Sequence, residues 1–345
     1  MRYPHFLPEG GTIGFAAPSF GCATEPYRTA FENAQKNFRA MGYDLLLGPN
    51  VYAADGTGIS SAPERCAEEW MSLYESSGCD ILLSCGGGEL MCEILPYLDP
   101  ERIRSAAPKW FMGYSDNTNL TYLLTTMFDV ASVYGPCAPA FGMQPWHEAI
   151  GHAMKLLQGQ ELTQTGYDLY EAEPLKSETN PLAPYHTTEP RRTRVFNAPD
   201  GDESSVDFSG RLIGGCVDCL VNLTGTRFDY THDFLERYRE DGFIWFLETC
   251  DLNVFAIRRA FWQMEQAGWF EHVRGFMIGR PLAGQEDLFG LDHFRAVTDV
   301  IGHLGVPILM DVDLGHIPPM MPLITGSLAH VSLRGQDISA GMTLA

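Results

Sequence analysis

Three residues whose types cooperate in acyl transfer each follow a predicted apolar strand: Ser115, Glu248 and His316. A serine hydroxyl needs a base to take its proton, imidazole is such a base, and a carboxylate fixes the tautomer of that imidazole. The order alone is weak support for a serine hydrolase, because all three residue types are common. Each also has a structural alternative: Ser115 as a helix cap, Glu248 as a strand-end charge and His316 as a backbone-bonded loop histidine.

The stretch around Ser115 predicts a tight turn from a strand into a helix. Residues 110–113 read as a short apolar strand ending on glycine, residues 116–118 offer side-chain oxygens for a helix start, and residues 120–127 keep helical spacing. The hydroxyl would then project at the carboxyl edge of a sheet beside helix N-terminal amides. This is the geometry of a nucleophile elbow, although Asn117 replaces the second glycine of G-x-S-x-G.

Composition limits the class of protein. The chain has 345 residues, 45% hydrophobic and 19% charged, so two globular domains are expected. A net charge of −21 argues against nucleic acid or anionic membrane as a partner, since no basic surface is available to neutralise phosphates. No apolar signal segment or membrane span is visible, which predicts a cytoplasmic location. Nine scattered cysteines fit buried, reduced thiols.

The first half of the chain alternates strands with helices, which predicts a parallel sheet covered on both faces. In such sheets ligands bind beyond the carboxyl ends of the strands, where Ser115 and the glycines at 86–88 are expected. The predicted strands lie at about 12–17, 43–47, 80–84, 110–112 and 131–134, and the predicted helices at about 25–41 and 62–77, with another through Met91, Ile94 and Leu95.

Residues 159–208 change character and are expected to connect two domains and to fold over an active site. They carry little periodicity and a basic cluster at 191–194 that could hold a substrate carboxylate or phosphate, or lie in a solvated loop. Regular pattern resumes at 209, with strands near 243–247, 273–278 and 307–310 and a terminal hairpin after 328. The expected domains are therefore 1–158 and 209–345.

Many short blocks of characteristic residues recur along the chain from residue 10 to about residue 330. They are Gly11–Ser19, Gly86-Gly87, Leu95–Asp99, Pro108–Asp116, Tyr134–Pro136, Gly210–Gly215, Leu223–Thr226, Phe246–Glu248, Gly315-His316, Leu323 and Gly326. The order and spacing of these blocks resemble those of the LD-carboxypeptidase and microcin-immunity family of serine peptidases.

The resemblance implies an α/β fold, with a flavodoxin-like parallel-sheet N-terminal domain and a smaller C-terminal α/β domain. It implies a homodimer, with Ser115 as nucleophile, His316 as general base and acid, and Glu248 as the orienting carboxylate, and we expect the reaction to need no metal or cofactor. An acyl-transfer site also needs donors for the developing oxyanion. The candidates are the amide of Asp116 and an amide from Gly87 or Gly88.

The resemblance implies two possible substrates. Family members that trim murein tetrapeptides at an L,D-bond, in peptidoglycan recycling, generally carry Arg before the paired glycines, where this chain has Cys85. Microcin-immunity members cleave a peptidyl-adenylate amide and stack a Trp on the nucleobase. Here no Trp occurs between Trp146 and Trp245, so stacking would fall to Tyr185, to Phe196 or to no residue at all. A small peptide or a peptide-nucleotide is the expected partner.

Several other interpretations compete with the serine hydrolase. Cys85 before three glycines resembles the nucleophile of glutamine amidotransferases, but no His-x-Glu pattern accompanies it. The CxxC spacing of residues 216–219 lacks a second ligand pair for zinc and is typical of a helix face. Asp311, Asp313 and His316 could suggest a metal, but a triad histidine would not be free to bind one. A non-catalytic two-domain peptide-binding protein is the rival from another class.

Overall fold

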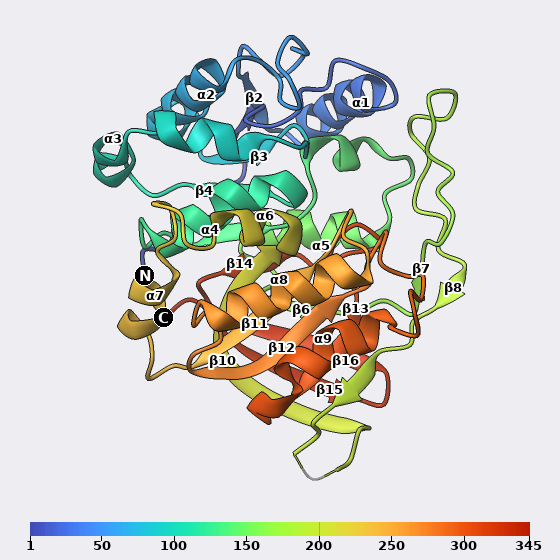
Figure 1. Cartoon of the computed structure of the whole chain (residues 1–345). Helices are drawn as coiled ribbons and strands as arrows, with labels where there is room; N and C mark the ends of the chain where they lie inside the picture. Colours follow the sequence, from blue (N-terminus) through green and yellow to red (C-terminus); the bar gives the residue numbers. More distant parts are fainter. Residues whose placement is uncertain (200) are drawn as a thin grey trace. The chain divides into compact units, whose positions relative to one another are not determined.

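The computed structural model describes residues 1–199 and 201–345 and divides them into two compact units (Figure 1). The first unit holds residues 1–161 and 173–186, and the second holds 162–172 with the rest of the described chain from 187 to 345. Residues 159–208, for which a connection between domains is expected, therefore contribute to both units.

Five strands of the first unit form a parallel sheet in the order β2-β1-β3-β4-β5. This is the flavodoxin-like order, in which the chain reverses direction across the sheet between β1 and β3. The structure thus confirms the predicted α/β fold with a flavodoxin-like N-terminal part. The loops that follow β1, β3 and β4 meet at the carboxyl edge, where ligands bind in sheets of this kind.

The apolar runs explain why these strands are buried. All residues of β3 and β4 are buried, as expected for parallel strands with both faces covered. The helix α1 buries one apolar stripe, and its Phe31 and Phe38 pack against Phe15 of β1 at ring-centroid distances of 5.2 and 5.9 Å. The helix α2 packs against η1 and α3.

The elements of the first unit are, in order, β1 (Thr12–Ala16), α1 (Tyr27–Ala40), β2 (Asp44–Leu47), α2 (Pro63–Glu75), β3 (Ile81–Ser84), η1 (Met91–Tyr97), α3 (Pro100–Ser105), β4 (Trp110–Gly113), η2 (Ser115–Asn117), α4 (Thr118–Thr126), β5 (Ser132–Tyr134), η3 (Ala138–Gly142) and α5 (Glu148–Leu157).

The helix expected through Met91, Ile94 and Leu95 differs from the prediction. It is a 3₁₀ helix, η1, and Pro96 lies inside it. Proline has no N–H to donate and clashes with the preceding turn of an α-helix, which limits this segment to the tighter, shorter form.

The second unit is built on an eight-stranded mixed sheet in the order β6-β16-β15-β10-β11-β12-β13-β9. The central strands β10 to β13 are parallel, and β9, β15, β16 and β6 pair antiparallel at the two sides. Helices connect the parallel strands, and α8 packs against both α6 and α9. Side chains of these three helices meet those of β11, β12 and β13 in the core.

The elements of the second unit are β6 (Thr163–Thr165), β7 (Leu169–Tyr170), β8 (Glu189–Pro190), β9 (Arg194–Phe196), β10 (Ser205–Cys216), α6 (Val217–Leu223), α7 (Thr231–Arg237), β11 (Phe243–Glu248), α8 (Val254–Gln266), β12 (Val273–Gly279), α9 (His293–Ile301), η4 (Gly302–Leu304), β13 (Ile308–Val312), β14 (Leu323–Thr325), β15 (Leu328–Arg334) and β16 (Asp337–Thr343).

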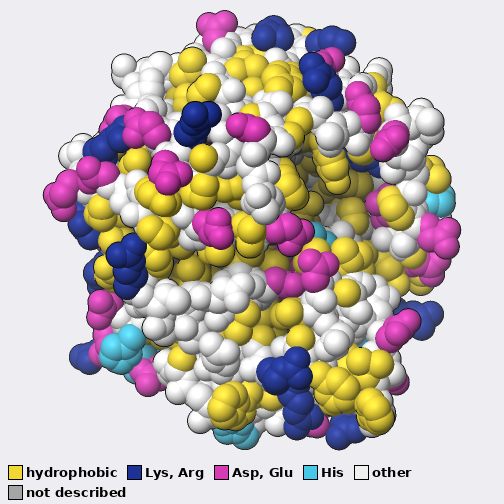
Figure 2. Space-filling view, turned by 45° about the horizontal axis from the view of Figure 1, so that its top comes forward, with side chains coloured by type: hydrophobic (Ala, Val, Ile, Leu, Met, Phe, Trp, Pro, Cys, Tyr) yellow, Lys and Arg dark blue, Asp and Glu magenta, His cyan; other side chains and the backbone are white. Residues whose placement is uncertain are grey.

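None of the helices in the described parts of the chain is both long enough and apolar enough to span a bilayer. On the face drawn in Figure 2, Lys and Arg side chains lie in small separate groups among acidic and apolar ones. That pattern agrees with the strongly negative net charge of −21.

Candidate active site

Ser115 occupies a strained turn directly after β4. Its φ is 63°, in the left-handed region that residues other than glycine seldom adopt. The 3₁₀ turn η2 begins at Ser115 and leads straight into α4. The Ser115 N–H donates to the hydroxyl of Tyr134 on β5, with N and O 3.3 Å apart. The strand–turn–helix predicted from sequence is present, and it places the serine at the carboxyl edge of the sheet.

The contacts of Asn117 show why this elbow has one glycine and lacks the second. A Cβ on Gly113 would lie only 2.7 Å from Cγ of Asn117, so the amide side chain fills the space that the glycine leaves. The Nδ2 of Asn117 donates to the carbonyls of Gly86, at 2.8 Å, and of Tyr114, at 3.0 Å. Asn117 thus fastens the elbow to the glycine loop that follows β3.

The two candidate glycines in that loop have different neighbours. A Cβ on Gly87 would lie 3.0 Å from Cβ and 3.1 Å from Oγ of Ser115, and 4.0 Å from the Asp116 nitrogen. A Cβ on Gly88 would instead overlap Oγ of Ser19. Of the two, Gly87 is the one whose backbone lies against the nucleophile candidate, because it has no side chain in the way.

The Asp116 carboxylate ties three segments together beneath the elbow. It accepts hydrogen bonds from Oγ of Ser19 at 2.6 Å, from the Met91 amide at 3.0 Å and from Nδ2 of Asn119 at 3.0 Å. Burial raises the pKa of Asp116 from 3.8 to about 6, although the bonds from Ser19 and Met91 favour the charged form. The side chain of Asp116 is therefore part of the support, and only its backbone amide is a candidate oxyanion donor.

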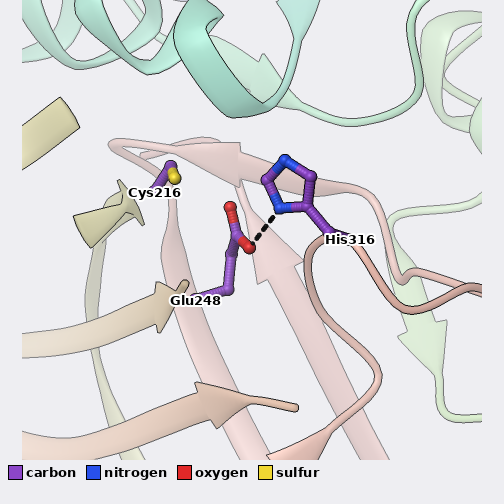
Figure 3. A group of neighbouring side chains, drawn as sticks. All are labelled: Cys216, Glu248 and His316. Atoms are coloured by element: carbon purple, nitrogen blue, oxygen red, sulfur yellow. Dashed lines mark hydrogen bonds and ion pairs between the residues drawn. The ribbon is translucent and has the colours of Figure 1, made fainter. Parts of the chain in front are cut away.

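In the second unit, Glu248 and His316 form a hydrogen-bonded pair (Figure 3). Glu248 is the last residue of β11, and His316 lies in the loop after β13. The His316 Nδ1 and the Glu248 Oε2 are 2.7 Å apart, and the Glu248 side chain is 1% exposed against 11% for His316. With Nδ1 engaged by the carboxylate, Nε2 is the nitrogen that can take a proton from a nucleophile.

The carboxylate controls the charge of the imidazole. Burial by itself lowers the pKa of His316, but the charge of Glu248 and hydrogen bonds to Cys250 and Glu248 outweigh it. The net result is a pKa raised above the ordinary 6.5. A raised pKa makes the imidazole a stronger proton acceptor and stabilises the imidazolium that forms when it takes a proton.

Three further residues position the pair, and sequence reasoning missed their role. Gly315 has φ 88°, and a Cβ at this position would overlap the Glu248 carboxylate. A Cβ on Gly279 would lie 2.9 Å from Cβ of Glu248. Asp218 of α6 accepts from the amides of residues 250 and 251, at 3.0 and 2.8 Å, and so fixes the turn after β11. Of these three residues, only Gly315 could have been singled out from the sequence, because it directly precedes His316.

Cys85 lies in the buried interior, and the CxxC segment 216–219 lies at the start of a helix. Cys85 is 1% exposed, and burial holds the pKa of its thiol well above 9.0, so it does not offer the thiolate that a cysteine nucleophile requires. The segment 216–219 begins the helix α6, as its spacing predicts, with Cys216 at the N-cap. Cys216 lies beside Glu248, and these two residues and His316 form a group of mixed ligand types.

The two aspartates that suggested a metal site with His316, Asp311 and Asp313, form ion pairs with other residues. Asp313 is fully buried and binds Arg280 at 2.5 Å and Arg191 at 3.5 Å, and Asp311 binds His293 at 3.0 Å. These carboxylates are therefore committed to other partners and do not form a metal site with the histidine of the pair.

The basic cluster does not form one anion-binding group. Arg191 is buried and also pairs with Asp337 at 3.4 Å, Arg192 is exposed, and the Arg194 guanidinium lies 4.1 Å from the ring centroid of Phe294. The Arg191 side chain is 3% exposed and pairs with aspartates, so its guanidinium is already engaged within the fold. Arg191 therefore has a structural role in place of the expected role of holding a substrate anion.

A serine on a strand–turn–helix elbow and a hydrogen-bonded carboxylate–histidine pair are the groups that serine peptidases use. Comparison with known proteins agrees. Residues 13–135 match the LD-carboxypeptidase N-terminal domain, and residues 209–331 match the LD-carboxypeptidase C-terminal domain. The chain belongs to the LD-carboxypeptidase family of serine peptidases.

Individual relatives cover nearly the whole chain. A predicted carboxypeptidase of Vibrio cholerae is 26% identical over 323 residues, which span 93% of this chain and 92% of the relative. The microcin C7 self-immunity protein MccF of Escherichia coli is 24% identical over 344 residues, 96% of this chain and 94% of MccF. The solved structure of MccF with aspartyl sulfamoyl adenosine superposes with a TM-score of 0.81 at 22% identity, covering 100% of this chain and 99% of that one.

Proposed function

We propose that this protein is a metal-independent serine hydrolase in which Ser115, His316 and Glu248 act as one catalytic triad. The 2.7 Å bond between Nδ1 of His316 and the buried Glu248 carboxylate is the observation that carries the proposal. It fixes the imidazole tautomer with its basic nitrogen at Nε2, which is the state a serine nucleophile needs. The strained φ of 63° at Ser115 supports the assignment of the nucleophile.

In the first half of the reaction, the Ser115 Oγ attacks the substrate carbonyl while Nε2 of His316 takes the hydroxyl proton. The negative charge that develops on the carbonyl oxygen is met by the amide of Asp116 and an amide of the Gly87 loop. His316 then gives its proton to the leaving nitrogen, the carbon–nitrogen bond breaks, and the acyl group stays on Ser115. Glu248 keeps its charge throughout and stabilises the imidazolium.

In the second half, water replaces the amine. His316 takes a proton from the water, the resulting hydroxide attacks the acyl carbonyl, and the same proton returns to the Ser115 Oγ as the ester breaks. No metal or cofactor is needed for this sequence, because the acid, the base and the nucleophile are all side chains of the chain.

As substrate we infer an amide near the carboxyl end of a small peptide, of the murein tetrapeptide L,D-type. The family membership and the relatives named as carboxypeptidases support this choice. A shorter match, 24% identical over 140 residues, is to the murein tetrapeptide carboxypeptidase of Pseudomonas aeruginosa. Cys85, in the place where such enzymes generally carry Arg, predicts that this chain holds the substrate carboxylate by other groups.

The second candidate substrate is a peptidyl-adenylate amide, cleaved in self-immunity or detoxification. The match to MccF over 96% of this chain favours it. Neither aromatic residue proposed for nucleobase stacking stands free: the Tyr185 ring lies 5.5 Å from the ring of His147, and the Phe196 ring 6.0 Å from that of Phe294. A base that stacks on either residue would have to share these contacts.

The test is a mass-spectrometric turnover assay that offers both substrates to the wild type, to Ser115→Ala and to the surface control Ser72→Ala. Loss of the terminal D-alanine identifies the murein-trimming activity, and cleavage of the adenylate amide identifies the alternative. We expect Ser115→Ala to abolish turnover and Ser72→Ala to retain it. Full hydrolysis by Ser115→Ala would refute the triad, and binding of peptide without turnover by the wild type would favour a non-catalytic binding protein.

The homodimer implied by the family resemblance and the cytoplasmic location predicted from the sequence belong to this proposal. Light scattering of the purified protein checks the first and cell fractionation the second.

A further inference from the structure

Cys216 adds a sulfur to the Glu248–His316 pair. One ligand atom from each of the three residues lies within 4.8 Å of the other two. Figure 3 shows the Glu248 carboxylate between the Cys216 thiol on one side and the His316 ring on the other. The three residues come from the ends of β10 and β11 and from the loop after β13, so the sheet itself holds them together.

We propose that Cys216, Glu248 and His316 bind a zinc ion, or a metal of similar preference, and that this metal inhibits the enzyme. Thiolate, imidazole and carboxylate are the three ligand types that zinc takes in proteins. Magnesium and calcium prefer oxygen ligands alone, so this set disfavours them. Three protein ligands leave the fourth tetrahedral position for water or for a carboxylate of a substrate.

Small side-chain movements suffice to form the site. In a tetrahedral zinc site the ligand atoms lie roughly 3.3–3.6 Å apart. The Nδ1 of His316 and the Oε2 of Glu248, now at 2.7 Å, would separate slightly, and the thiol would approach from within its present 4.8 Å. Binding releases two protons, that of the Cys216 thiol and the one shared by His316 and Glu248.

The group formed by these three residues is largely shielded from solvent. Cys216 and Glu248 are each 1% exposed. Unlike these, the second group of possible ligands in the described chain, Glu236, Glu271 and His272, is exposed at all three residues and has no thiol. Solvent competes for a metal at the exposed group, and the sulfur of the buried one gives a spectroscopic signal that distinguishes the two.

The inhibition follows from the proposed function, on which this part of the inference rests. A metal on Nδ1 of His316 replaces the hydrogen bond that fixes the catalytic tautomer, and its charge makes the ring a weaker base. Metal binding and triad catalysis therefore exclude one another. Metal binding itself does not depend on the proposed function, and the experiment measures the two separately.

The first measurement is a Co²⁺ titration of the reduced, metal-free protein. We expect a near-ultraviolet thiolate-to-cobalt band and visible bands of a tetrahedral ion, with about one equivalent bound. Cys216→Ser should lose the thiolate band and bind at least about tenfold more weakly, since even the loss of an outer-shell partner costs ~10–100-fold. Cys66→Ser, which removes a buried thiol of α2 in the other unit, and His272→Ala should keep the band.

A thiolate band that is absent in the wild type, or that persists unchanged in Cys216→Ser, would overturn the site. X-ray absorption of the zinc-loaded wild type needs no variant and covers the case in which Cys216→Ser fails to fold. It should show one sulfur at about 2.3 Å with nitrogen and oxygen at about 2.0–2.2 Å. A zinc shell without sulfur would refute the proposal.

The second measurement is turnover with one equivalent of zinc and then with a chelator. We expect at least tenfold loss with zinc, recovery with the chelator, and a weaker effect of zinc on Cys216→Ser. Full turnover with zinc bound would refute inhibition and leave the metal site standing. A cobalt thiolate band in a protein that hydrolyses no substrate would support the metal site while the proposed function fails.

Discussion

The contact between Gly87 and Ser115 gives a sharp prediction about the substitution Gly87→Ala. The new Cβ would lie 3.0 Å from Cβ and 3.1 Å from Oγ of Ser115, whereas an ordinary contact is 3.4–4 Å. The serine or the glycine loop must therefore move by a few tenths of an ångström. A displacement of about 1 Å at a reacting group can cost about 100-fold. Scaled to this smaller shift, we expect kcat/KM to fall by about 3–10-fold, about 0.6–1.4 kcal/mol.

The fold should tolerate this change. Gly87 is not among the glycines in the left-handed region, so alanine can adopt its backbone. A matched control is Gly151→Ala in α5, where a Cβ meets no atom within 4 Å. That variant should keep wild-type kinetics and gain about 0.5–1 kcal/mol in stability, because alanine is the better helix former.

The assay is steady-state kinetics on whichever substrate the wild type cleaves, beside urea unfolding of both variants. The expected loss in Gly87→Ala lies mainly in kcat, since the perturbed groups act in the transition state. Wild-type kcat in Gly87→Ala would refute the placement of this glycine in the oxyanion site. A loss of activity matched by a loss of folding would refute the argument that the effect is local.

Three other substitutions test the electrostatics. Because Glu248 raises the pKa of His316 above 6.5, the activity of the wild type should rise with pH through a midpoint above 6.5. In a pH–rate profile, Glu248→Gln should lower both that midpoint and kcat. The pKa of Asp116 is about 6 in the folded protein, whereas in the unfolded chain it has the ordinary value of 3.8. Relative to Asp116→Asn, the wild type should therefore lose about 2–2.5 kcal/mol of stability as pH rises from 4 to 7 in urea unfolding, and a pH-independent difference would contradict this. Arg191→Met should destabilise the protein by about 1–3 kcal/mol, since it leaves the buried Asp313 with one partner fewer, while KM stays unchanged. A raised KM in a stable variant would restore the substrate-binding role.

Much of the fold was predictable because the buried strands are uninterrupted apolar runs. The buried strands β1, β3, β4 and β11 and the amphipathic helix α1 all lie within a residue or two of their predicted positions. Their order in the sheet is set by packing between distant segments, and only the family resemblance supplied it. The change of η1 to a 3₁₀ helix depended on one proline.

The site was predictable in part. The spacing around Ser115 predicted its strand–turn–helix, because those signals lie within a dozen residues of one another. The bond between Glu248 and His316 joins residues 68 positions apart, which no local pattern can reveal. The burial of Arg191 was hidden for a similar reason, since its partners Asp313 and Asp337 are 122 and 146 positions further along the chain.

The measurement that tests the central claim most directly is covalent labelling by a fluorophosphonate, followed by intact-mass and peptide-mass analysis. Such reagents phosphonylate a serine only when a base activates it, and they need no knowledge of the substrate. We predict one phosphonyl group on Ser115 in the wild type, none in Ser115→Ala, and strongly slowed labelling in His316→Ala and Glu248→Gln. Labelling at another residue, or equal labelling rates in the wild type and His316→Ala, would contradict the triad.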